Sequence, residues 1–552
     1  MAEAQEFVKR LALLKSRRSN FDILFDQVQR VAWPDGASFL TKRSDGESRT
    51  RDIYETTAAN AIQKFESAMA SFLIPRHLRW HGLKAGNEEL NEIRAVKEFF
   101  ESATSTLFKV RESTDARFYG QMGTNIKSLG AYGNGCIYVD ENPSGRGIRY
   151  KAIPISQAWI EVDYHGTVDT LYYEYELTAK AAAQKWPHDV PEKAAKAIEG
   201  GQHFKEHTYL HVVQPNDPKK VDPESVVAAG MPFQAWDISI SDKSIIAQPD
   251  GTEMGGFFEF PYMWSRFTLN PNEIYGRGPA MLSLPDILTL QEMEKTFMRS
   301  GHKVADPPLL VAHDGRLGRG RRKIRLAPGG LNYGAVDESG RPKILPLQTG
   351  ARLDMTESMM ERKRTSIEDF FFLPLFDILA KDRVEMTATE VLKRSEEKGQ
   401  LITPIVGRQQ SELLGPMIDR EVGILQRQGM LPEVPPELAG GEFDIEYDSL
   451  ATRMQMSDEV SAYQRLEEVF RPQMQLDATL AQVFNVEDAI RDFGNTMGIR
   501  TTLFKSKDEM DEIRAAQAKE AQSAQLSQQA LPMAQAAKTA SEIKMPQEGG
   551  PQ

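Results

Sequence analysis

The stretch YGRGPAMLSLPDILTL, residues Tyr275–Leu290, marks the point where strand-like sequence gives way to helix. A helical segment runs from Pro279 to about Lys303, and apolar side chains gather in its first turns: Leu282, Leu284, Ile287, Leu288 and Leu290. Residues 304–354 then have the texture of loops and strands, and a second helical pattern covers about Thr356–Phe376. These patterns predict two helices that flank a small insertion.

Helical patterns also dominate the N-terminal part of the chain. Residues 5–32 carry an apolar stripe at steps of mostly three and four, interrupted by Arg18; its members are Phe7, Leu11, Leu14, Phe21, Phe25 and Val28. A second helix is predicted over about Thr56–Leu73, before Pro75, and a third over about Glu88–Val110.

From Asn125 the sequence changes to short segments rich in Tyr, Val, Ile and Trp, separated by polar or Gly/Pro turns. Such segments are typical of antiparallel strands: Cys136–Asp140, Val168–Leu177, His207–Val213, Gln234–Ile240 and Phe257–Phe267. A short helix is predicted at about Ala179–Trp186, between two of these strands.

The C-terminal part returns to helix. A break at Asp377–Arg383 precedes a long helical stretch, Thr387–Gly429, that we expect to be interrupted near Thr403-Pro404. Phe443–Asp448 has the pattern of a strand, and helices follow to about Met497. Beyond Arg514 the chain is rich in Ala, Gln and Ser, which predicts a solvated helix or a disordered tail. The fold class is therefore α+β.

Composition limits the possible functions. The chain has 552 residues, enough for about three or four domains, and 40% of them are hydrophobic. Its formal net charge of -12 argues against a general nucleic-acid coat. The single cysteine, Cys136, excludes an internal disulfide and makes a cysteine-based zinc site unexpected. No apolar run is long enough for a membrane-spanning helix, and the N-terminus lacks the apolar core of a secretory signal.

Motifs for enzymatic chemistry give no positive signal. We find no phosphate-binding G-x4-G-K-[ST] loop, no G-x-S-x-G elbow and no H-E-x-x-H pair. His203, His207 and His211 would share one face of a helix and suggest a metal site, but a strand here would separate them. Asp444, Glu446 and Asp448 alternate with apolar residues, which favours a strand with one wet face over a set of metal ligands.

Three further clusters each allow a simpler interpretation. A basic run could contact phosphate or an acidic protein partner, or could be a solvated loop: Arg316, Arg319, Arg321, Arg322, Lys323 and Arg325. An aromatic cluster favours a core or a subunit interface over a ligand cage: Phe370, Phe371, Phe372 and Phe376. The glycine-rich Tyr132–Gly135 predicts a turn before a strand instead of a phosphate cradle.

Several longer strings resemble a known family. They are DIYETTAANAIQKFESAMASFLIPRHLRW at 52–80, YGRGPAMLSLPDILTL at 275–290, and MTATEVLKRSEEKGQLITPIVGRQQSELLGPMIDR at 386–420, followed by RQGMLPEVPPEL. With these strings the chain resembles the head-to-tail connector, or portal, proteins of short-tailed bacteriophages over about residues 5–500. The Ala/Gln-rich tail is not part of the resemblance.

The resemblance implies a ring, usually of twelve subunits, in which each subunit has a wing, a helical stem, a clip and a crown. The expected parts of this chain are a wing at 1–278, a first stem helix at 279–303, a clip at 304–354, a second stem helix at 355–376, a tunnel loop at 377–386, a long kinked helix and strand at 387–449, crown helices at 450–513 and a polar tail at 514–552. The wing would mix helices and strands, and the clip would be a small α/β element. We expect the N-terminal helices to lie on the ring exterior and to help subunits associate.

The implied function is a channel at one capsid vertex through which double-stranded DNA is packaged and ejected, without enzymatic activity or cofactor. The implied partners are other copies of the chain, the major capsid protein, the terminase large subunit, a tail adaptor, scaffolding or internal core proteins, and DNA held without sequence preference. The implied location is the virion, after assembly in the host cytoplasm, with no membrane contact.

The resemblance also nominates residues. Lys381 and Arg383 in the tunnel loop are the first candidates to meet DNA, and Arg362, Lys363 and Arg364 are the second. Consecutive helical residues point about 100° apart, so only some of these three can face a channel. The basic run at 316–325 is the candidate surface for terminase or tail proteins. The alternatives are another ring-forming virion protein, such as a tail adaptor or internal core protein, and a nuclease that uses Asp444, Glu446 and Asp448.

Overall fold

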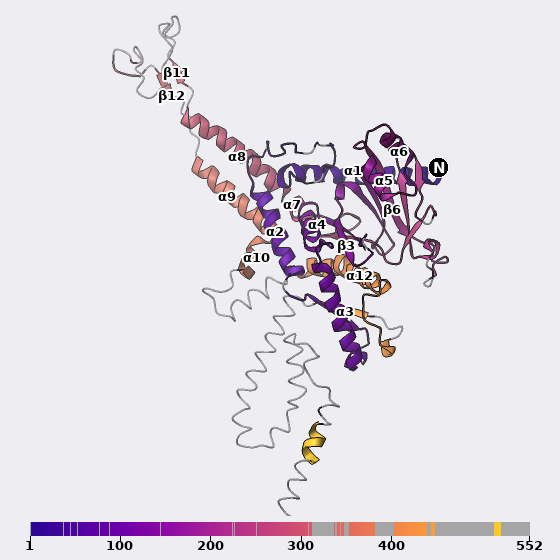
Figure 1. The fold of residues 1–552 in the computed structure, drawn as a ribbon. Coiled ribbons are helices and arrows are strands. Elements are labelled where there is room, and N and C mark those ends of the chain that lie inside the picture. The colour runs from indigo at the N-terminus through magenta and orange to yellow at the C-terminus, as the bar shows by residue number, and fades with distance from the viewer. Residues whose placement is uncertain are drawn as a thin grey trace, which may run out of the picture. The chain divides into compact units, whose positions relative to one another are not determined.

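The computed structural model describes residues 2–306 except positions 37, 43, 45, 52, 77, 88, 144, 223, 224, 226 and 250, and then residues 309–311, 336, 339–342, 344–346, 353–380, 402–438, 443–447, 510 and 513–519. The chain forms two compact units. The first comprises Met1–Trp80 and Ser105–Leu431, and the second comprises His81–Thr104 and Pro432–Gln552. Figure 1 draws the helices and strands of this mixed α and β structure.

The helices agree largely with the sequence periodicity. The first unit contains α1 (Ala2–Ala32), α2 (Thr57–Leu73), α4 (Phe118–Tyr132), α5 (Ala179–Lys185), α6 (Glu192–Glu199), α7 (Pro279–Leu282), α8 (Leu284–Ala305), α9 (Leu353–Phe370), α10 (Leu373–Ala380), a π-helical turn η4 (Gln410–Leu414) and α12 (Gly415–Arg427). The helix α3 (Arg94–Glu112) supplies residues to both units. The predictions for α1, α2, α3 and α5 are confirmed, whereas α4 and α6 were not predicted.

The strands of the first unit are antiparallel, as predicted, and those before α7 form a larger and a smaller sheet. The larger sheet has the order β4-β5-β6-β7-β8, with β9 on β7: β4 (Ala158–Val162), β5 (Val168–Thr178), β6 (Glu206–Pro215), β7 (Phe233–Ser239), β8 (Ser244–Ile246) and β9 (Gly255–Phe257). The smaller sheet has the order β10-β2-β3: β10 (Tyr262–Arg266), β2 (Asn134–Glu141) and β3 (Ile148–Ala152). Because His207 and His211 lie in β6, the helical arrangement of histidines is wrong.

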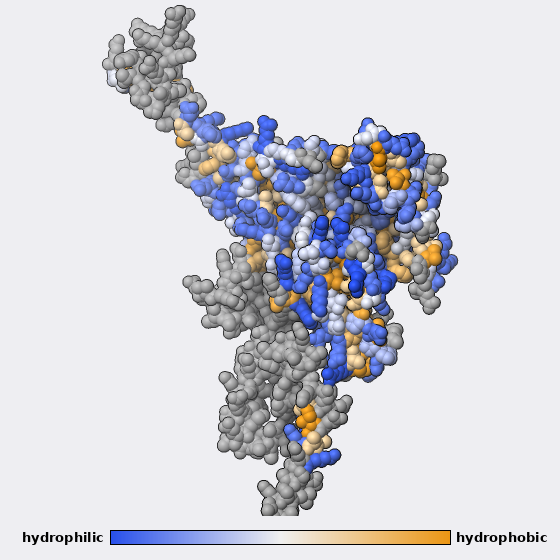
Figure 2. Space-filling model, viewed as in Figure 1, coloured by the Kyte–Doolittle hydropathy of each residue, from blue (hydrophilic) through white to orange (hydrophobic). Residues whose placement is uncertain are grey.

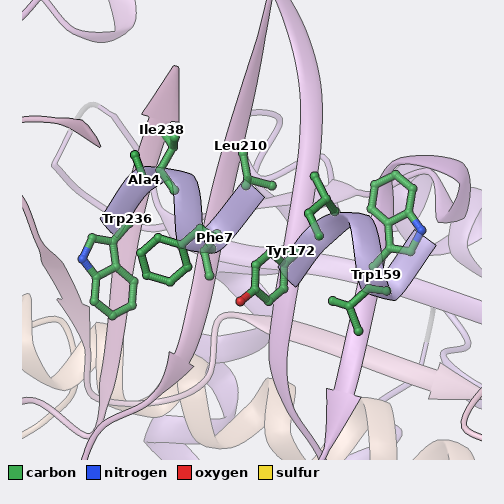
Figure 3. Close-up of a cluster of buried hydrophobic side chains, with 10 residues drawn as sticks. Ala4, Phe7, Trp159, Tyr172, Leu210, Trp236 and Ile238 are labelled. Carbon is green, nitrogen blue, oxygen red and sulfur yellow. The ribbon is translucent and has the colours of Figure 1, made fainter. Parts of the chain in front are cut away.

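The apolar stripe of α1 packs on the larger sheet of its own chain. Phe7 lies 4.9 Å from Trp236 between ring centroids, and Figure 3 shows the labelled side chains of α1 and of the strands facing one another. The cluster comprises Ala4, Phe7, Leu11, Leu14, Trp159, Tyr172, Leu210, Val212, Trp236 and Ile238. The first part of the stripe, from Phe7 to Leu14, is thus core of its own chain, whereas the expected position of the N-terminal helices on the ring exterior stays a prediction.

Arg18, which interrupts the stripe in the sequence, is itself buried. Its guanidinium donates to the carbonyl oxygens of Ile155, at 2.8 Å, and of Ala158, and it lies 4.5 Å from the ring centroid of Trp159. Asp22, one helical turn away, lies 2.8 Å from Arg18 Nε. These contacts compensate the cost of burying the cation. Arg18 therefore lies on the buried face of α1, together with the apolar stripe.

The YGRG motif, Tyr275–Gly278, packs against the end of α4. Gly133 ends α4 with a φ of +68°, in the left-handed region that favours glycine. A Cβ at Gly276 would lie 2.4 Å from the Gly133 oxygen, and one at Gly278 would lie 2.6 Å from the Gly133 nitrogen. Asn134 joins the same contact through two hydrogen bonds with the backbone of Gly276, at 3.0 and 2.8 Å. Of the predicted turn at Tyr132–Gly135, only Gly133 lies between elements, because Tyr132 ends α4 and Asn134 and Gly135 belong to β2 (Asn134–Glu141).

Two helical breaks differ from the sequence expectation. The helix α9 ends at Phe370, although the sequence pattern predicted a helix to Phe376. Phe372 has a φ of +57°, and α10 then runs through Asp377, where the break was expected, to Ala380. Pro374 explains the earlier break, because its ring would clash with the carbonyl of Phe370 in a continuous helix. Phe371 and Phe376 are buried, as expected for a core cluster, whereas Phe372 is partly buried and Phe370 is exposed.

The long helical stretch is irregular at a different place than expected. Residues 402–409 are helical through Thr403-Pro404, and the π-helical turn η4 follows at Gln410–Leu414. Pro416 lacks an N–H and crowds the carbonyl four residues earlier, which favours a widened turn there.

A buried ion pair fixes α12 in the first unit. The side chains of Arg111 and Glu421 are 1% and 0% exposed, and Arg111 Nε lies 3.1 Å from Glu421 Oε2. The Tyr150 hydroxyl donates to the other carboxylate oxygen at 2.6 Å. The carboxylate therefore has partners on both oxygens.

In the second unit, β1 (His81–Ala85) pairs antiparallel with β13 (Phe443–Tyr447), so that His81 faces Tyr447. Asp444 and Glu446 are exposed and alternate with partly buried residues, which confirms the prediction of a strand with one wet face. Asp448 lies outside the described residues. Among the described residues, no group of three potential metal ligands comes together.

Candidate functional site

The paired helices α8 and α9 form the most distinctive part of the first unit. Figure 1 shows them side by side, with β11 (Leu309–Val311) and β12 (Ile344–Pro346) beyond their ends. These two strands pair antiparallel, Leu309 with Pro346. The chain therefore leaves along α8, passes through a small two-stranded element and returns along α9. This is the arrangement of two helices around an insertion that the sequence predicts.

Ion pairs hold the two helices together. Lys363 of α9 places Nζ 2.7 Å from Asp286 Oδ1 of α8, and the Ser366 hydroxyl donates to the other oxygen of Asp286 at 2.7 Å. The hydrogen bonds from Lys363 and then Ser366 lower the pKa of Asp286 below its ordinary value. Asp286 is thus ionised at neutral pH and links successive turns of α9 to the start of α8.

Arg364 connects α9 with a third segment. Its Nη2 atom lies 2.7 Å from Glu55 Oε2 and 3.4 Å from Glu294 of α8, and its Nη1 atom lies 3.2 Å from Glu361. Burial opposes ionisation of Glu55, but hydrogen bonds from Arg364 and Thr57 outweigh it and lower the pKa of Glu55.

The segment before α2 is also bound to α8 through Gln291. Its side-chain oxygen accepts the backbone N–H groups of Tyr54 and Glu55 at 2.8 and 3.1 Å, and its amide nitrogen donates to the Glu55 carbonyl at 2.6 Å. Gln291 is buried, so these three bonds compensate most of the polar groups of its amide. The segment before α2 is therefore bound to both helices of the pair, to α8 through Gln291 and to α9 through Arg364.

The three basic residues of α9 consequently have different roles. They lie in the second half of α9. Lys363 and Arg364 are engaged in the ion pairs above, whereas Arg362 is exposed and forms no ion pair within the described part of the chain. Lys381 and Arg383 lie outside the described residues. So do all six cations of the basic run: Arg316, Arg319, Arg321, Arg322, Lys323 and Arg325.

Apolar side chains also lie exposed on the helix pair. Met355 is 63% and Met359 51% exposed on α9, one turn apart, and Leu288 is 42% exposed on α8. Leu288 also lines a groove of about 570 Å³, together with Thr289, Glu292, Met293, Thr296 and Thr356. Figure 2 shows apolar colour among the blue of this region. The sequence analysis did not single out this surface, although the spacing of four between the methionines was a usable signal.

None of the helices in the part of the chain that the structure describes combines the length and the apolar character needed to cross a membrane.

Comparisons with known proteins add independent information. A family model described as bacteriophage head to tail connecting protein matches residues 4–504. The chain is 26% identical over 551 residues to a protein of Salmonella phage epsilon15 named portal protein, covering 98% of this chain and 96% of that relative. It is 24% identical over 560 residues to a probable portal protein of Bordetella phage BPP-1, with the same two coverages of 98% and 96%.

One solved structure, titled virion of native gene transfer agent (GTA) particle, contains a similar chain. The TM-score is 0.38 at 10% identity, with 80% of this chain and 94% of that chain covered. A score of this size supports no conclusion about the fold.

Proposed function

The chain belongs to the bacteriophage head to tail connecting proteins and functions as a portal, and from this premise we propose that it acts as a ring of twelve copies. The match over residues 4–504 carries the proposal, because it includes the helix pair, the insertion and the N-terminal helices. Portal proteins are structural components of virions. The proposed ring lies at one capsid vertex, after assembly in the host cytoplasm.

We assign α8 and α9 to the channel wall and the intervening segment, which includes β11 and β12, to the clip. The 22 residues of α8 correspond to a wall of about 33 Å at 1.5 Å per residue. The ion pairs of Lys363 and Arg364 support this assignment, because a wall that DNA passes needs its helices fixed to one another. In this scheme the wing comprises the N-terminal helices and the two sheets.

The exposed apolar surface of the helix pair supports contact with a second copy. Met355, Met359 and Leu288 would cost little to leave in water singly, but all three are exposed on one helix pair, where Leu288 lines a groove together with residues of both helices. A neighbouring subunit that covers this surface from one side would bury it, and head-to-tail repetition of such a contact closes a ring.

Arg362 is the cation of α9 that we propose to face DNA, because its guanidinium is exposed and free of ion pairs within the described residues. Contacts between such exposed charges are worth about 0–1 kcal/mol, which allows a duplex to slide. Twelve copies of a chain with a net charge of -12 would carry about -144 in total, so a ring would hold DNA weakly overall. Lys381 and Arg383 remain the proposed tunnel-loop contacts.

The proposed partners are the major capsid protein, the terminase large subunit during packaging, a tail adaptor, and scaffolding or internal core proteins. The basic run at 316–325 is the proposed docking site for terminase or tail proteins, since it lies within the segment assigned to the clip. We propose no enzymatic activity and no cofactor.

Gold-labelled antibodies raised against the chain test its place in the particle. Bound to tailless heads, they should mark one vertex of each head. Label distributed over the whole shell, or found on tails alone, would contradict the proposal.

A further inference from the structure

A second feature of the first unit has no part in the proposed channel. A cavity of about 720 Å³ lies between the two sheets, with walls from β2, β3, β5, β6, β7, β9 and β10. Four tyrosines line it: Tyr138, Tyr173, Tyr175 and Tyr262. Pockets of about 300–1,000 Å³ with aromatic walls and a few placed polar groups are typical small-ligand sites. The size and the wall of this cavity both fit that class.

The tyrosine rings offer flat surfaces. Tyr173 and Tyr175 are stacked, with centroids 4.7 Å apart and planes 18° apart. Tyr138 and Tyr262 lie 4.8 Å apart between centroids, and Phe257 borders the same space. An aromatic ring of a ligand would find offset or edge contacts on such walls.

The acidic and imidazole groups of the cavity are already engaged. Asp237 is buried and accepts from Lys185 at 3.2 Å, from the Tyr175 hydroxyl at 3.4 Å and from the Trp186 indole at 3.4 Å. His211 Nδ1 lies 2.6 Å from the Tyr262 hydroxyl, and burial lowers the pKa of this histidine. Neither group therefore adds an uncompensated charge at neutral pH.

The cation Lys151 differs from them. Its Nζ lies 3.1 Å from the Tyr173 hydroxyl and 5.2 Å from the centroid of that ring, and no carboxylate within the described residues lies at ion-pair distance. Desolvation, and after it the positive charges of Lys185 and Arg149, lower the pKa of Lys151. The fourth charged lining residue, Asp140, accepts the Tyr138 hydroxyl at 2.6 Å and lies 3.3 Å from Arg420. Lys151 is thus an exposed ammonium group at the edge of the cavity, and it has no counter-ion among the described residues.

We propose that this cavity binds a small anion carried on a flat aromatic body, with the ring against the tyrosines and the anionic group at Lys151. A cationic ligand, which aromatic walls could otherwise attract, is disfavoured. The ammonium groups of Lys151 and Lys185 already lie over Tyr173 and Tyr175, at 5.2 and 4.9 Å from the ring centroids.

Four probes separate the contribution of the negative charge from that of the aromatic ring. Each is titrated calorimetrically into the assembled full-length protein. They are 1-naphthoate, the uncharged 1-naphthalenemethanol, the cation 1-naphthylmethylammonium and the non-aromatic anion acetate. The expected result is one naphthoate site per chain, with each other probe binding at least about tenfold more weakly. Equal binding of naphthoate and naphthalenemethanol, preference for the cation, or no binding of naphthoate at about 5 mM would overturn the proposal.

Two variants locate the site. Lys151→Met should weaken naphthoate binding at least about tenfold and leave naphthalenemethanol within about twofold, a difference that a general loss of structure would not produce. Lys180→Met, on α5 but outside the cavity lining, should bind naphthoate as the unmodified protein does. If both variants bind naphthoate equally, Lys151 does not hold the anion. The probe series on the unmodified protein decides the question even if Lys151→Met does not assemble.

Discussion

Arg364 and Glu55, which are 309 positions apart in the sequence, form an ion pair with Nη2 and Oε2 separated by 2.7 Å. The other carboxylate oxygen, Oε1, accepts the backbone N–H groups of Thr56 and Thr57, both at 2.9 Å, at the start of α2. A single carboxylate therefore binds the second helix of the pair and caps the N-terminus of α2. Glu55 therefore links the start of α2 to α9, so that loss of Arg364 would also affect the segment before α2.

Arg364→Ala should lower the free energy of unfolding by about 1–2 kcal/mol, because it leaves Glu55 without its charged hydrogen-bond donor. The measurement is chemical denaturation followed by far-UV circular dichroism. Arg362→Ala is the matched control: its side chain is exposed and without an ion pair in the described residues, so we expect a change within about 0.5 kcal/mol. Equal effects of the two substitutions would show that the pair with Glu55 contributes nothing.

The pair of Lys363 with Asp286 should make stability depend on pH. The folded pKa of Asp286 is lowered from 3.8, so its contribution is present above pH 3.8 and is lost as the pH falls through the lower folded value. Asp286→Asn should lower the thermal midpoint at pH 7, and this difference should shrink below about pH 3.8. The free energy involved is at most about 1 kcal/mol, because the Lys363 side chain is 39% exposed.

Asp369→Asn provides the control for this pH dependence, since Asp369 is exposed on α9, the helix that carries Lys363. The Asp369→Asn substitution should leave the thermal midpoint unchanged both at pH 7 and below about pH 3.8. A difference between Asp286→Asn and the unmodified protein that stays constant down to pH 3 would contradict the role given to the ionised carboxylate.

Hydrophobic periodicity was sufficient to predict α1, α2 and the main strands, because each of these elements has one buried and one wetter face. The helix α4 was missed for the opposite reason. Nine of its fifteen residues are buried, among them Asn125, Ser128 and Gly130, so it shows no clear polar face. A Cβ at Gly130 would lie 2.8 Å from the Phe65 ring, which explains the glycine in a helix interior.

The candidate site could be predicted only in part. The sequence indicated two helices around an insertion and nominated three basic residues on the second helix. It could not indicate which of the three is free, because Asp286, Glu294 and Glu55 come from segments about 70 to 310 positions away; of the ion pairs described, only that of Arg364 with Glu361 lies within α9. Only contacts within a helix, three or four residues apart, can be inferred from spacing.

Glu421→Gln should be the most destabilising of the substitutions considered, by about 3–5 kcal/mol, because it leaves the buried Arg111 without its counter-charge. Thermal denaturation of the purified protein measures the effect. Glu292→Gln, in an exposed pair with Lys295 on α8, should not shift the midpoint measurably. A loss for Glu421→Gln no larger than that for Glu292→Gln would show that the buried pair is not required.

The tunnel-loop prediction concerns DNA and not folding. Lys381→Ala combined with Arg383→Ala should leave assembly normal but reduce DNA packaging or the retention of packaged DNA, because weak phosphate contacts in the channel are lost. The measurement is the amount of nuclease-protected DNA per head. Normal packaging and retention, with assembly confirmed by imaging, would show that these two residues do not contact DNA.

Negative-stain imaging of the purified full-length chain tests the central claim most directly. A portal predicts rings with a central hole of about 20–40 Å, wide enough for a DNA duplex, built by head-to-tail repetition of one interface. Twelve copies of a 62.0 kDa chain correspond to about 744 kDa, which mass photometry can check on the same sample. A compact monomer of 62.0 kDa without a hole, under conditions where the protein is folded, would contradict the account.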